Sequence, residues 1–237
     1  MKRFFERLYK GTAEEFYTLL EADLVNERKR FVITANPEIF VKGEKNVHIA
    51  DILLNPETTV VADGISVVKG LKILKMPPCH RITGVDIAEQ LLKLCNTHKK
   101  SVYLLGAKAE VLEAFKGVIK EKYKNLILAG SCDGYVDDKD ITFEEIKSLS
   151  PDVVLVALGV PAQEELIFKH LGGFSKGIFV GVGGSFDVLS GCKKRAPKLF
   201  IKLNLEWAYR IIKEPWRLKR FFNNNVRFIF TLKKRCR

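Results

Sequence analysis

Short runs of β-branched and other apolar residues recur along the chain, and each run ends in small or polar residues. The runs cover residues 31–34, 58–61, 102–105, 126–128, 153–157 and 178–182. They are continuous rather than alternating, which is typical of strands buried on both faces of a sheet. Segments with helical periodicity, such as 85–94 and 110–123, lie between them. Strand, short loop and helix in repeated order predict an α/β fold with a doubly wound, Rossmann-like, largely parallel sheet.

The residues that follow the first two runs suggest chemistry at the strand ends, where open α/β sheets bind their ligands. Asp63 closes a buried run, and a carboxylate there can accept a proton from an attacking hydroxyl as a general base. The alternative is a turn aspartate that binds its own loop. Thr34 and Asn36 end the preceding run and place a hydroxyl and an amide at the same rim.

Glycines after the later runs indicate close approach of the backbone to a ligand. Gly106 opens a helical segment, and Gly183 and Gly184 follow the last run. Asp133-Gly134-Tyr135 combines a carboxylate, a flexible backbone and an aromatic face, which suits a nucleobase and its ribose. Because no G-x-G-x-x-G pattern follows a strand, a nicotinamide dehydrogenase is not expected.

The sequence predicts no metal site. The loop 137–140 contains a D-x-D spacing, which can hold a metal on a sugar-nucleotide diphosphate, but a helix follows it and N-capping explains these acids equally well. The five cysteines and four histidines are scattered without paired spacing. This pattern favours reduced thiols in the cytosol rather than disulfides or structural zinc.

The C-terminal 32 residues carry ten basic residues against two acids, and so hold +8 of the net charge of +12. Seven aromatic residues are interleaved with these charges. Basic and bulky apolar side chains together are typical of a membrane interface. No apolar run approaches the ~18 residues that cross a bilayer, and no secretory signal is recognisable. We therefore expect an α/β catalytic domain at 1–197 and a helical membrane-targeting appendage at 198–237.

The appendage pattern predicts two helical stretches, 198–213 and a second one that starts near Pro215. The second stretch has a basic arc and a broad apolar arc. The basic arc contains Arg217, Arg220, Arg227 and Lys234, and the apolar arc contains Leu218, Phe222, Val226, Ile229 and Phe230. Such a helix either docks on the main domain with its basic face in water or lies on an anionic membrane.

A series of spaced motifs occurs in a defined order along the chain. They are Thr34-Ala35-Asn36, Ala62-Asp63-Gly64, Arg81-Ile82-Thr83-Gly84, Leu105-Gly106-Ala107-Lys108, Gly130 with Asp133-Gly134-Tyr135, Gly159-Val160-Pro161-Ala162-Gln163-Glu164, Gly181-Val182-Gly183-Gly184, Lys194-Arg195-Ala196-Pro197, and Leu205-Glu206-Trp207-Ala208-Tyr209-Arg210 with Glu214-Pro215-Trp216-Arg217. In this order they resemble the WecG/TagA/CpsF family of bacterial glycosyltransferases over about residues 29–220.

The resemblance implies an inverting, metal-independent transfer, without a cofactor, from a UDP-sugar to a sugar linked to undecaprenyl diphosphate. It is strongest to members that transfer N-acetylmannosamine from UDP-N-acetylmannosamine to lipid-linked N-acetylglucosamine in wall teichoic acid synthesis. By the matching motifs, Asp63 is the catalytic base, Thr34 and Asn36 line its pocket, and Arg81 and Gln163 contact the donor or the reacting sugar.

The remaining motif positions carry further implications. Those that match the nucleotide pocket are Gly106, Asp133, Gly134, Tyr135, Gly183 and Gly184. Arg210, Arg217 and Arg220 match arginines that complete the site at the membrane and neutralise the departing diphosphate. The enzyme is then peripheral on the cytoplasmic face of the membrane.

Three motif positions receive no such role. Ala162 departs from the family, whose members commonly have Lys or Arg there. Glu164 and Glu206 are interpreted as structural partners of nearby arginines rather than as acids or bases.

Other functions stay open at this point. The same fold can use another UDP-sugar, such as N-acetylmannosaminuronic acid, glucose or glucuronic acid, for capsule, exopolysaccharide or surface antigen synthesis. A pI of about 9.4 is compatible with a nucleic-acid-binding protein. The basic surplus is confined to the amphipathic tail, however, so we expect no nucleic-acid partner. A non-catalytic scaffold would tolerate loss of the Asp63 carboxylate. Apolar residues on exposed helix faces leave a homo-oligomer possible.

Overall fold

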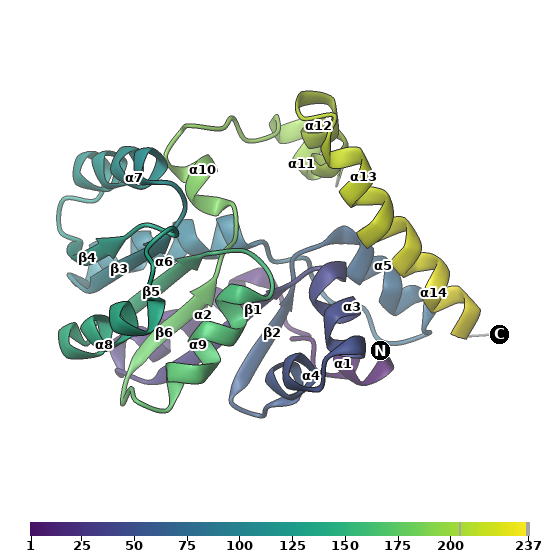
Figure 1. Ribbon diagram of the computed structural model, residues 1–237, viewed down its shortest axis with the longest axis horizontal. Helices are drawn as coiled ribbons and strands as arrows, with labels where there is room; N and C mark the ends of the chain where they lie inside the picture. The colour runs from purple at the N-terminus through teal and green to yellow at the C-terminus, as the bar shows by residue number, and fades with distance from the viewer. Residues whose placement is uncertain (204, 236–237) are drawn as a thin grey trace.

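The computed structural model describes residues 1–203 and 205–235, apart from some side chains in the C-terminal helices. Those side chains are the ones of Lys198, Lys202, Arg217, Arg220, Asn223, Arg227 and Arg235. Within the described ranges the strands are β1 (Lys29–Ala35), β2 (Thr58–Ala62), β3 (Ser101–Gly106), β4 (Ile127–Cys132), β5 (Val153–Ala157) and β6 (Gly177–Gly181). Their order is β2-β1-β6-β5-β3-β4, and every neighbouring pair is parallel (Figure 1). The predicted α/β fold with a parallel sheet is confirmed.

Alternate side chains of each strand enter two separate cores, one on each face of the sheet. On β1, Phe31 and Ile33 join one core and Val32 joins the other. The first core is covered by α1 (Lys2–Glu6), α3 (Pro37–Lys45), α4 (Val47–Leu54), α5 (Ile65–Ile73), α8 (Lys139–Leu149) and α9 (Ala162–Leu171). The second is covered by α2 (Ala13–Val25), α6 (Gly84–His98), α7 (Ala109–Lys122) and α10 (Ser185–Leu189). Burial on both faces explains why the apolar runs do not alternate.

Strand β4 is longer than the predicted run at 126–128. It continues through small residues to Cys132, at one edge of the sheet. Gly130 is needed there, because a Cβ atom on it would come within 2.6 Å of the Tyr103 ring. The longer strand places Asp133 directly after its carboxyl end.

The C-terminal region is helical, as predicted, but its breaks differ. Its helices are α11 (Lys198–Lys202), α12 (Glu206–Lys213), α13 (Arg217–Phe221), a π-helical segment (Phe222–Val226) and α14 (Arg227–Arg235). The single stretch predicted at 198–213 is interrupted between α11 and α12, where the Leu205 N–H bonds to the Phe200 carbonyl at 2.7 Å. Figure 1 shows α13 and α14 continuing one another along α5.

The predicted apolar arc of the last helix is wrong in part. The prediction assumed an unbroken α-helix, whereas a π-helical turn bonds residue i to i+5 and shifts the positions that follow it. Phe228 and Leu232 are fully buried in the first core, and Phe228 stacks on Phe5 with ring centroids 6.1 Å apart. By contrast, Phe222 and Phe230 of the predicted arc are 54% and 67% exposed. The helix therefore docks on the main domain and still presents aromatic side chains to solvent.

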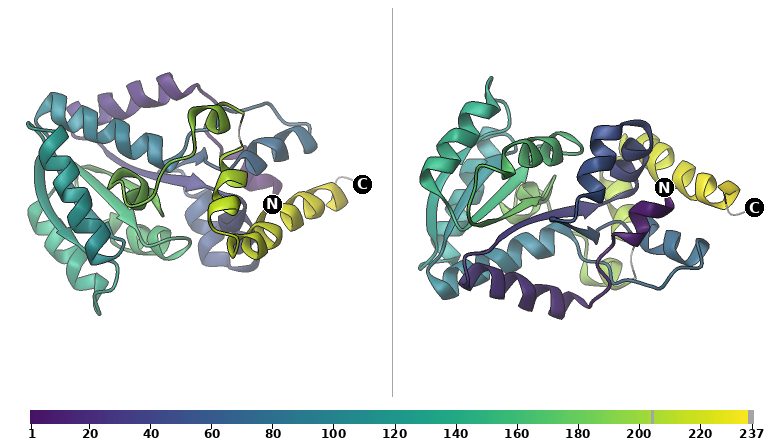
Figure 2. Two further views of the ribbon diagram at one scale, coloured as in Figure 1. Left: turned by 90° about the horizontal axis from the view of Figure 1, so that it is seen from above. Right: turned by 90° about the horizontal axis from the view of Figure 1, so that it is seen from below.

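Helix α14 extends beyond the sheet toward one end of the molecule, close to the N-terminus (Figure 2). Among the described residues, no helix has both the length and the apolar character needed to span a membrane.

Candidate active site

The carboxyl ends of the parallel strands share one edge of the sheet, and the residues predicted from the strand ends lie there. Thr34 is the second-last residue of β1 and Asn36 follows that strand. Asp63 follows β2, and Gly106 ends β3. Asp133, Gly134 and Tyr135 follow β4, and Gly183 and Gly184 follow β6. The prediction that these residues share an edge is confirmed.

Asp63 and Asn36 are brought together where β1 and β2 end. The Asp63 N–H donates to the Ala35 carbonyl at 3.0 Å. A Cβ atom on Gly64 would come within 3.1 Å of Pro37 Cδ, so the two loops pack tightly. Asn36 caps helix α3, since its Oδ1 accepts from the Ile39 N–H at 3.1 Å. The cap holds Asn36 beside Asp63.

The environment of Asp63 suits a proton acceptor. Burial raises the pKa of its carboxyl from 3.8 to about 6; Arg81 and Arg210 oppose this rise, and Glu206 adds to it. Among the described residues, no backbone or side-chain group donates a hydrogen bond to this carboxylate, so it does not bind its own loop as a turn aspartate would. At neutral pH it is mostly ionised, with a pKa close to the working range of a general base.

Two arginines flank Asp63 and share one carboxylate. Arg81 donates from Nε to the Asp63 carbonyl oxygen at 2.6 Å and from Nη2 to Glu206 Oε2 at 3.0 Å. Arg210 donates from Nη2 to Glu206 Oε1 at 2.9 Å. Burial by itself raises the pKa of Glu206, but the Arg210 charge and the Arg81 hydrogen bond hold that pKa below its ordinary value. Glu206 therefore stays ionised and joins the C-terminal region to the strand edge.

The C-terminal region is also tied to the helices that follow Asn36 and Asp63. Asn224 in the π-helical segment donates to Glu38 of α3 at 2.8 Å. Ser66 of α5 donates to Asn225 at 2.9 Å. Of the three predicted arginines, Arg210 lies at the site, whereas the side chains of Arg217 and Arg220 lie outside the described part of the chain.

Gln163 joins the loops that follow β5 and β6. It is 1% exposed, and its Oε1 accepts from the N–H groups of Gly159 at 3.1 Å and Gly183 at 3.0 Å. Thr34 adds a link from β1, because its hydroxyl donates to the Gly181 carbonyl at 2.7 Å. These bonds fix the loops beside Asp63, and a direct contact of Gln163 with a sugar stays a prediction.

Glu164 differs from the expectation that it pairs with an arginine. Its Oε1 accepts from Gln163 Nε2 at 2.8 Å, and its Oε2 is buried without a hydrogen-bond partner among the described residues. The sequence carries no signal for this isolation, since Glu-rich first turns are common on solvated helices.

Gly106 lies where the connections of the sheet diverge. Helix α7 after β3 and helix α9 after β5 cover opposite faces, so the two loops separate at a topological switch point, where such folds bind ligands. Gly106 has φ +118°, and a Cβ atom there would lie 2.5 Å from the Ala157 carbonyl oxygen. The Ala107 carbonyl accepts from the Gly134 N–H at 2.8 Å. The predicted glycines thus form one continuous rim.

At the end of this rim, Asp133 accepts from the Tyr135 N–H at 2.8 Å, and the Tyr135 side chain is 72% exposed. In the D-x-D segment, Asp138 caps α8 by accepting from the Asp140 N–H at 2.9 Å, as N-capping predicted. Among the described residues, no three His, Cys, Asp or Glu side chains converge as metal ligands.

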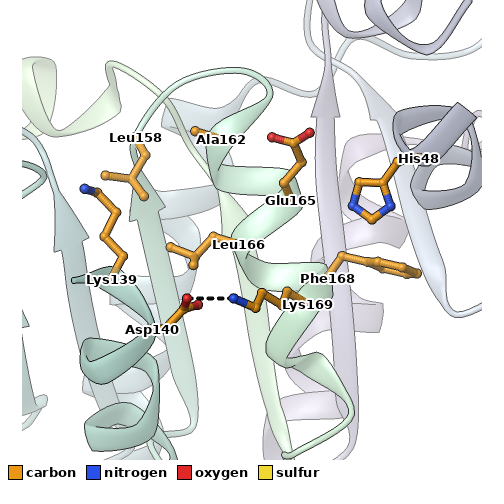
Figure 3. A pocket seen from close by; sticks show the side chains of 9 residues that line it. All are labelled: His48, Lys139, Asp140, Leu158, Ala162, Glu165, Leu166, Phe168 and Lys169. Atoms are coloured by element: carbon orange, nitrogen blue, oxygen red, sulfur yellow. Dashed lines mark hydrogen bonds and ion pairs between the residues drawn. The ribbon is translucent and has the colours of Figure 1, made fainter. Parts of the chain in front are cut away.

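A groove of about 620 Å³ lies between α4, α8 and α9 (Figure 3). Lys169 pairs with Asp140 along its wall at 2.6 Å. Ala162, the position that departs from the family pattern, lines it, but none of the predicted site residues does. The carboxylate and arginines that can carry chemistry are at the strand edge.

A doubly wound parallel sheet whose carboxyl edge gathers a raised-pKa carboxylate, arginines and glycine loops is typical of α/β enzymes, which bind their substrates at the strand ends. The model of the glycosyl transferase WecG/TagA/CpsF family matches residues 5–237, and the chain belongs to this family. The chain is 40% identical over 211 residues to the N-acetylglucosaminyldiphosphoundecaprenol N-acetyl-beta-D-mannosaminyltransferase of Bacillus subtilis (strain 168), covering 88% of this chain and 81% of that protein. It is 41% identical over 192 residues to the protein of the same name from Staphylococcus aureus (strain MW2), covering 80% and 74%.

Proposed function

We propose that this protein transfers N-acetylmannosamine from UDP-N-acetylmannosamine to N-acetylglucosaminyldiphosphoundecaprenol, with inversion and without a metal ion, in wall teichoic acid synthesis. The names of the similar proteins from two organisms support this donor sugar and acceptor. The observation that carries the proposal is the Asp63 carboxylate, held beside Arg81 and Arg210 at the strand edge.

In the proposed reaction, the Asp63 carboxylate takes the proton of an acceptor hydroxyl. The hydroxyl oxygen forms a bond to C1 of the donor sugar while the bond between C1 and the phosphate oxygen breaks. UDP leaves with that electron pair, on the face opposite the attack, which inverts the anomeric configuration. One displacement therefore needs one base and a means to stabilise the leaving diphosphate.

Arginines stabilise the leaving diphosphate in this proposal. Arg81 and Arg210 lie near Asp63, and a guanidinium fork matches phosphate oxygens in two hydrogen bonds. Arg217 and Arg220 belong to the same proposed cluster by their motif positions. Thr34 and Asn36 border the acceptor side, and Gln163 acts beside the donor.

We place the nucleotide at the switch point. Gly106 and Gly134 let the backbone approach the diphosphate or ribose, and Gly183 and Gly184 border the same pocket from β6. The exposed Tyr135 ring can stack on uracil, and Asp133 can accept from the ribose.

Residues 198–237 act in this proposal as an appendage that binds the cytoplasmic face of the membrane. Large apolar side chains exposed there are Leu199, Leu203, Leu205, Trp207, Ile212, Trp216, Leu218, Phe222 and Phe230. The same segment holds most of the excess positive charge. Each Lys or Arg near an anionic leaflet contributes about 1 kcal/mol, so aromatic insertion and charge act together.

The test is UDP release from a panel of UDP-sugars in EDTA, with and without N-acetylglucosaminyldiphosphoryl lipid in liposomes. We expect acceptor-dependent release with UDP-N-acetylmannosamine, its loss in Asp63→Asn, and its retention in Asp140→Asn, a matched substitution at the surface of α8. If UDP is released instead from UDP-glucose, UDP-glucuronic acid or the mannosaminuronic acid donor, the protein acts in the synthesis of another polymer. Full activity of Asp63→Asn would refute the proposed base.

A further inference from the structure

Glu164 is a fully buried acid that the proposed reaction does not use. It lies in the first turn of α9, which packs on β1, β6, α4 and α8. One of its oxygens accepts from Gln163, and the other has no hydrogen-bond partner among the described residues. A buried carboxylate in this situation would carry an uncompensated charge, which costs several kcal/mol.

The N–H groups of Gly159 and Gly183 select one orientation of the Gln163 side-chain amide, and Glu164 accepts from its NH2 group in that orientation. A half-turn of that amide exchanges its oxygen and its NH2 group. In the orientation that the structure shows, the amide oxygen accepts hydrogen bonds from the N–H groups of Gly159 and Gly183, and the NH2 group donates to Glu164 Oε1. In the reverse orientation, an NH2 group would face both glycine N–H groups, and an oxygen would face the acid.

The amide in turn reaches residues beside the proposed base. A Cβ atom on Gly181 would lie 2.6 Å from Gln163 Nε2, so the amide packs directly on β6. The Gly181 carbonyl accepts from the Thr34 hydroxyl. A chain of contacts therefore connects Glu164, through Gln163, to the loops after β5 and β6 and to the end of β1.

The surroundings of Glu164 favour its neutral form. Burial raises the pKa of this carboxyl from 4.5 to about 8. The hydrogen bonds from Gln163 and from the backbone of Glu164 itself oppose this rise, and the charges of Glu165 on α9 and Glu38 on α3 add to it. The N-terminus of a helix favours a carboxylate, yet this effect is at most about 2 kcal/mol, less than the cost of burying an unpaired charge.

We propose that Glu164 is a positioning residue, whose neutral carboxyl holds the Gln163 amide so that a single oxygen binds Gly159 and Gly183 and fixes both loops of the site. This role rests on the proposed function, because the loops matter through the transfer reaction. When Glu164 ionises, its buried charge is relieved by entry of water or cations, and the loops lose their spacing.

Kinetics of the full chain test the role through the pH profile. Glu164→Gln keeps the shape and the acceptor oxygen without a titrating proton, so we expect kcat within about threefold of wild type and loss of an alkaline decline near pH 8. Glu164→Leu removes the acceptor, and kcat should fall by up to about a hundredfold, as for a displacement of about 1 Å. Glu165→Gln is the matched comparison: it should keep the alkaline decline but move it to lower pH, because the charge of Glu165 raises the pKa of Glu164. Equal losses in Glu164→Gln and Glu164→Leu, or an unchanged alkaline decline in Glu164→Gln, would overturn the proposal.

Infrared spectroscopy separates this inference from the proposed function, because it needs no turnover. Wild type minus Glu164→Gln should show the carbonyl band of a protonated carboxyl group at neutral pH, and the band should disappear as the pH rises through about 8. If no donor is turned over and this band is present, the proposed function fails while the neutral acid stands. Absence of the band at neutral pH would overturn the role of Glu164, whatever the kinetics show.

Discussion

Replacing Glu164 with glutamine should remove a strong dependence of stability on pH. In the unfolded chain this carboxyl ionises near its ordinary pKa of 4.5, and in the folded protein it ionises at about 8. Between these values the unfolded state has released a proton that the folded state retains. The free energy of unfolding therefore falls as the pH rises, so that the stabilisation present below pH 4.5 is lost by pH 8.

The size of the effect follows from the width of this window. Each pH unit within it changes the free energy of unfolding by about 1.4 kcal/mol. From 4.5 to about 8 the total is at most about 5 kcal/mol. Between pH 5 and pH 8 it is about 3.5 kcal/mol, because the carboxyl group is only partly titrated at both limits. That is a large share of the 5–15 kcal/mol by which a typical domain is stable.

Urea denaturation at several pH values measures the effect. Far-UV circular dichroism is the suitable signal, because Trp207 and Trp216 both lie in the C-terminal region and do not report on the sheet. Wild type and Glu164→Gln share every other titrating group, including Asp63, so their difference isolates Glu164. The Glu165→Gln variant should keep the pH dependence, with its upper end at a lower pH, because the charge of Glu165 raises the pKa of Glu164.

The reasoning is refuted if the free energies of wild type and Glu164→Gln stay parallel from pH 5 to pH 8. Parallel curves would mean that Glu164 is ionised in the folded protein. A difference that grows with pH in favour of the glutamine variant is the expected result.

Four further predictions concern the base and the appendage. Because the pKa of Asp63 is about 6, kcat/KM should decline below that pH, and a profile flat to pH 5 would exclude Asp63 as the base. Glu206→Gln removes a charge that raises the pKa of Asp63, so the acid decline should move to lower pH, and a move upward would contradict this coupling. Phe228→Ala should lower stability by about 3–5 kcal/mol in urea denaturation, since the ring is fully buried. Its exposed neighbour should behave oppositely: Phe230→Ala should keep stability but weaken sedimentation with anionic liposomes, and equal binding would argue against membrane insertion there.

The strand ends show how far a sequence can lead toward a site. Continuous apolar runs predict parallel strands, and parallel strands must end at one edge, so the sequence alone assigns Thr34, Asp63 and Gly106 to a common rim. The sequence also predicts that Glu206 pairs with nearby arginines, and the structure identifies those arginines as Arg81 and Arg210.

Errors arose where an element departs from ideal periodicity. The arc containing Phe222 and Phe230 was derived from an unbroken α-helix, and the π-helical segment moved Phe228 and Leu232 into the core instead. The predicted run at 126–128 misses the end of strand β4, which continues through glycine and serine to Cys132. Glycine stands at position 130 because a Cβ atom there would come within 2.6 Å of the Tyr103 ring. The strand propensity of a short segment does not depend on a residue that is distant in sequence and packs against it only in the fold.

The α/β class, the family, the shared strand edge and the excess of positive charge at the C-terminus are all predictable from the sequence, because they depend on composition, order and local periodicity. The ionisation of Asp63 and Glu164 is not, and it becomes visible when the chain is folded. Both are acids in loops or first turns of ordinary pattern, and their pKa values depend on burial and on charges from distant segments. Electrostatic free energy depends on distances in space, which are set when the chain folds.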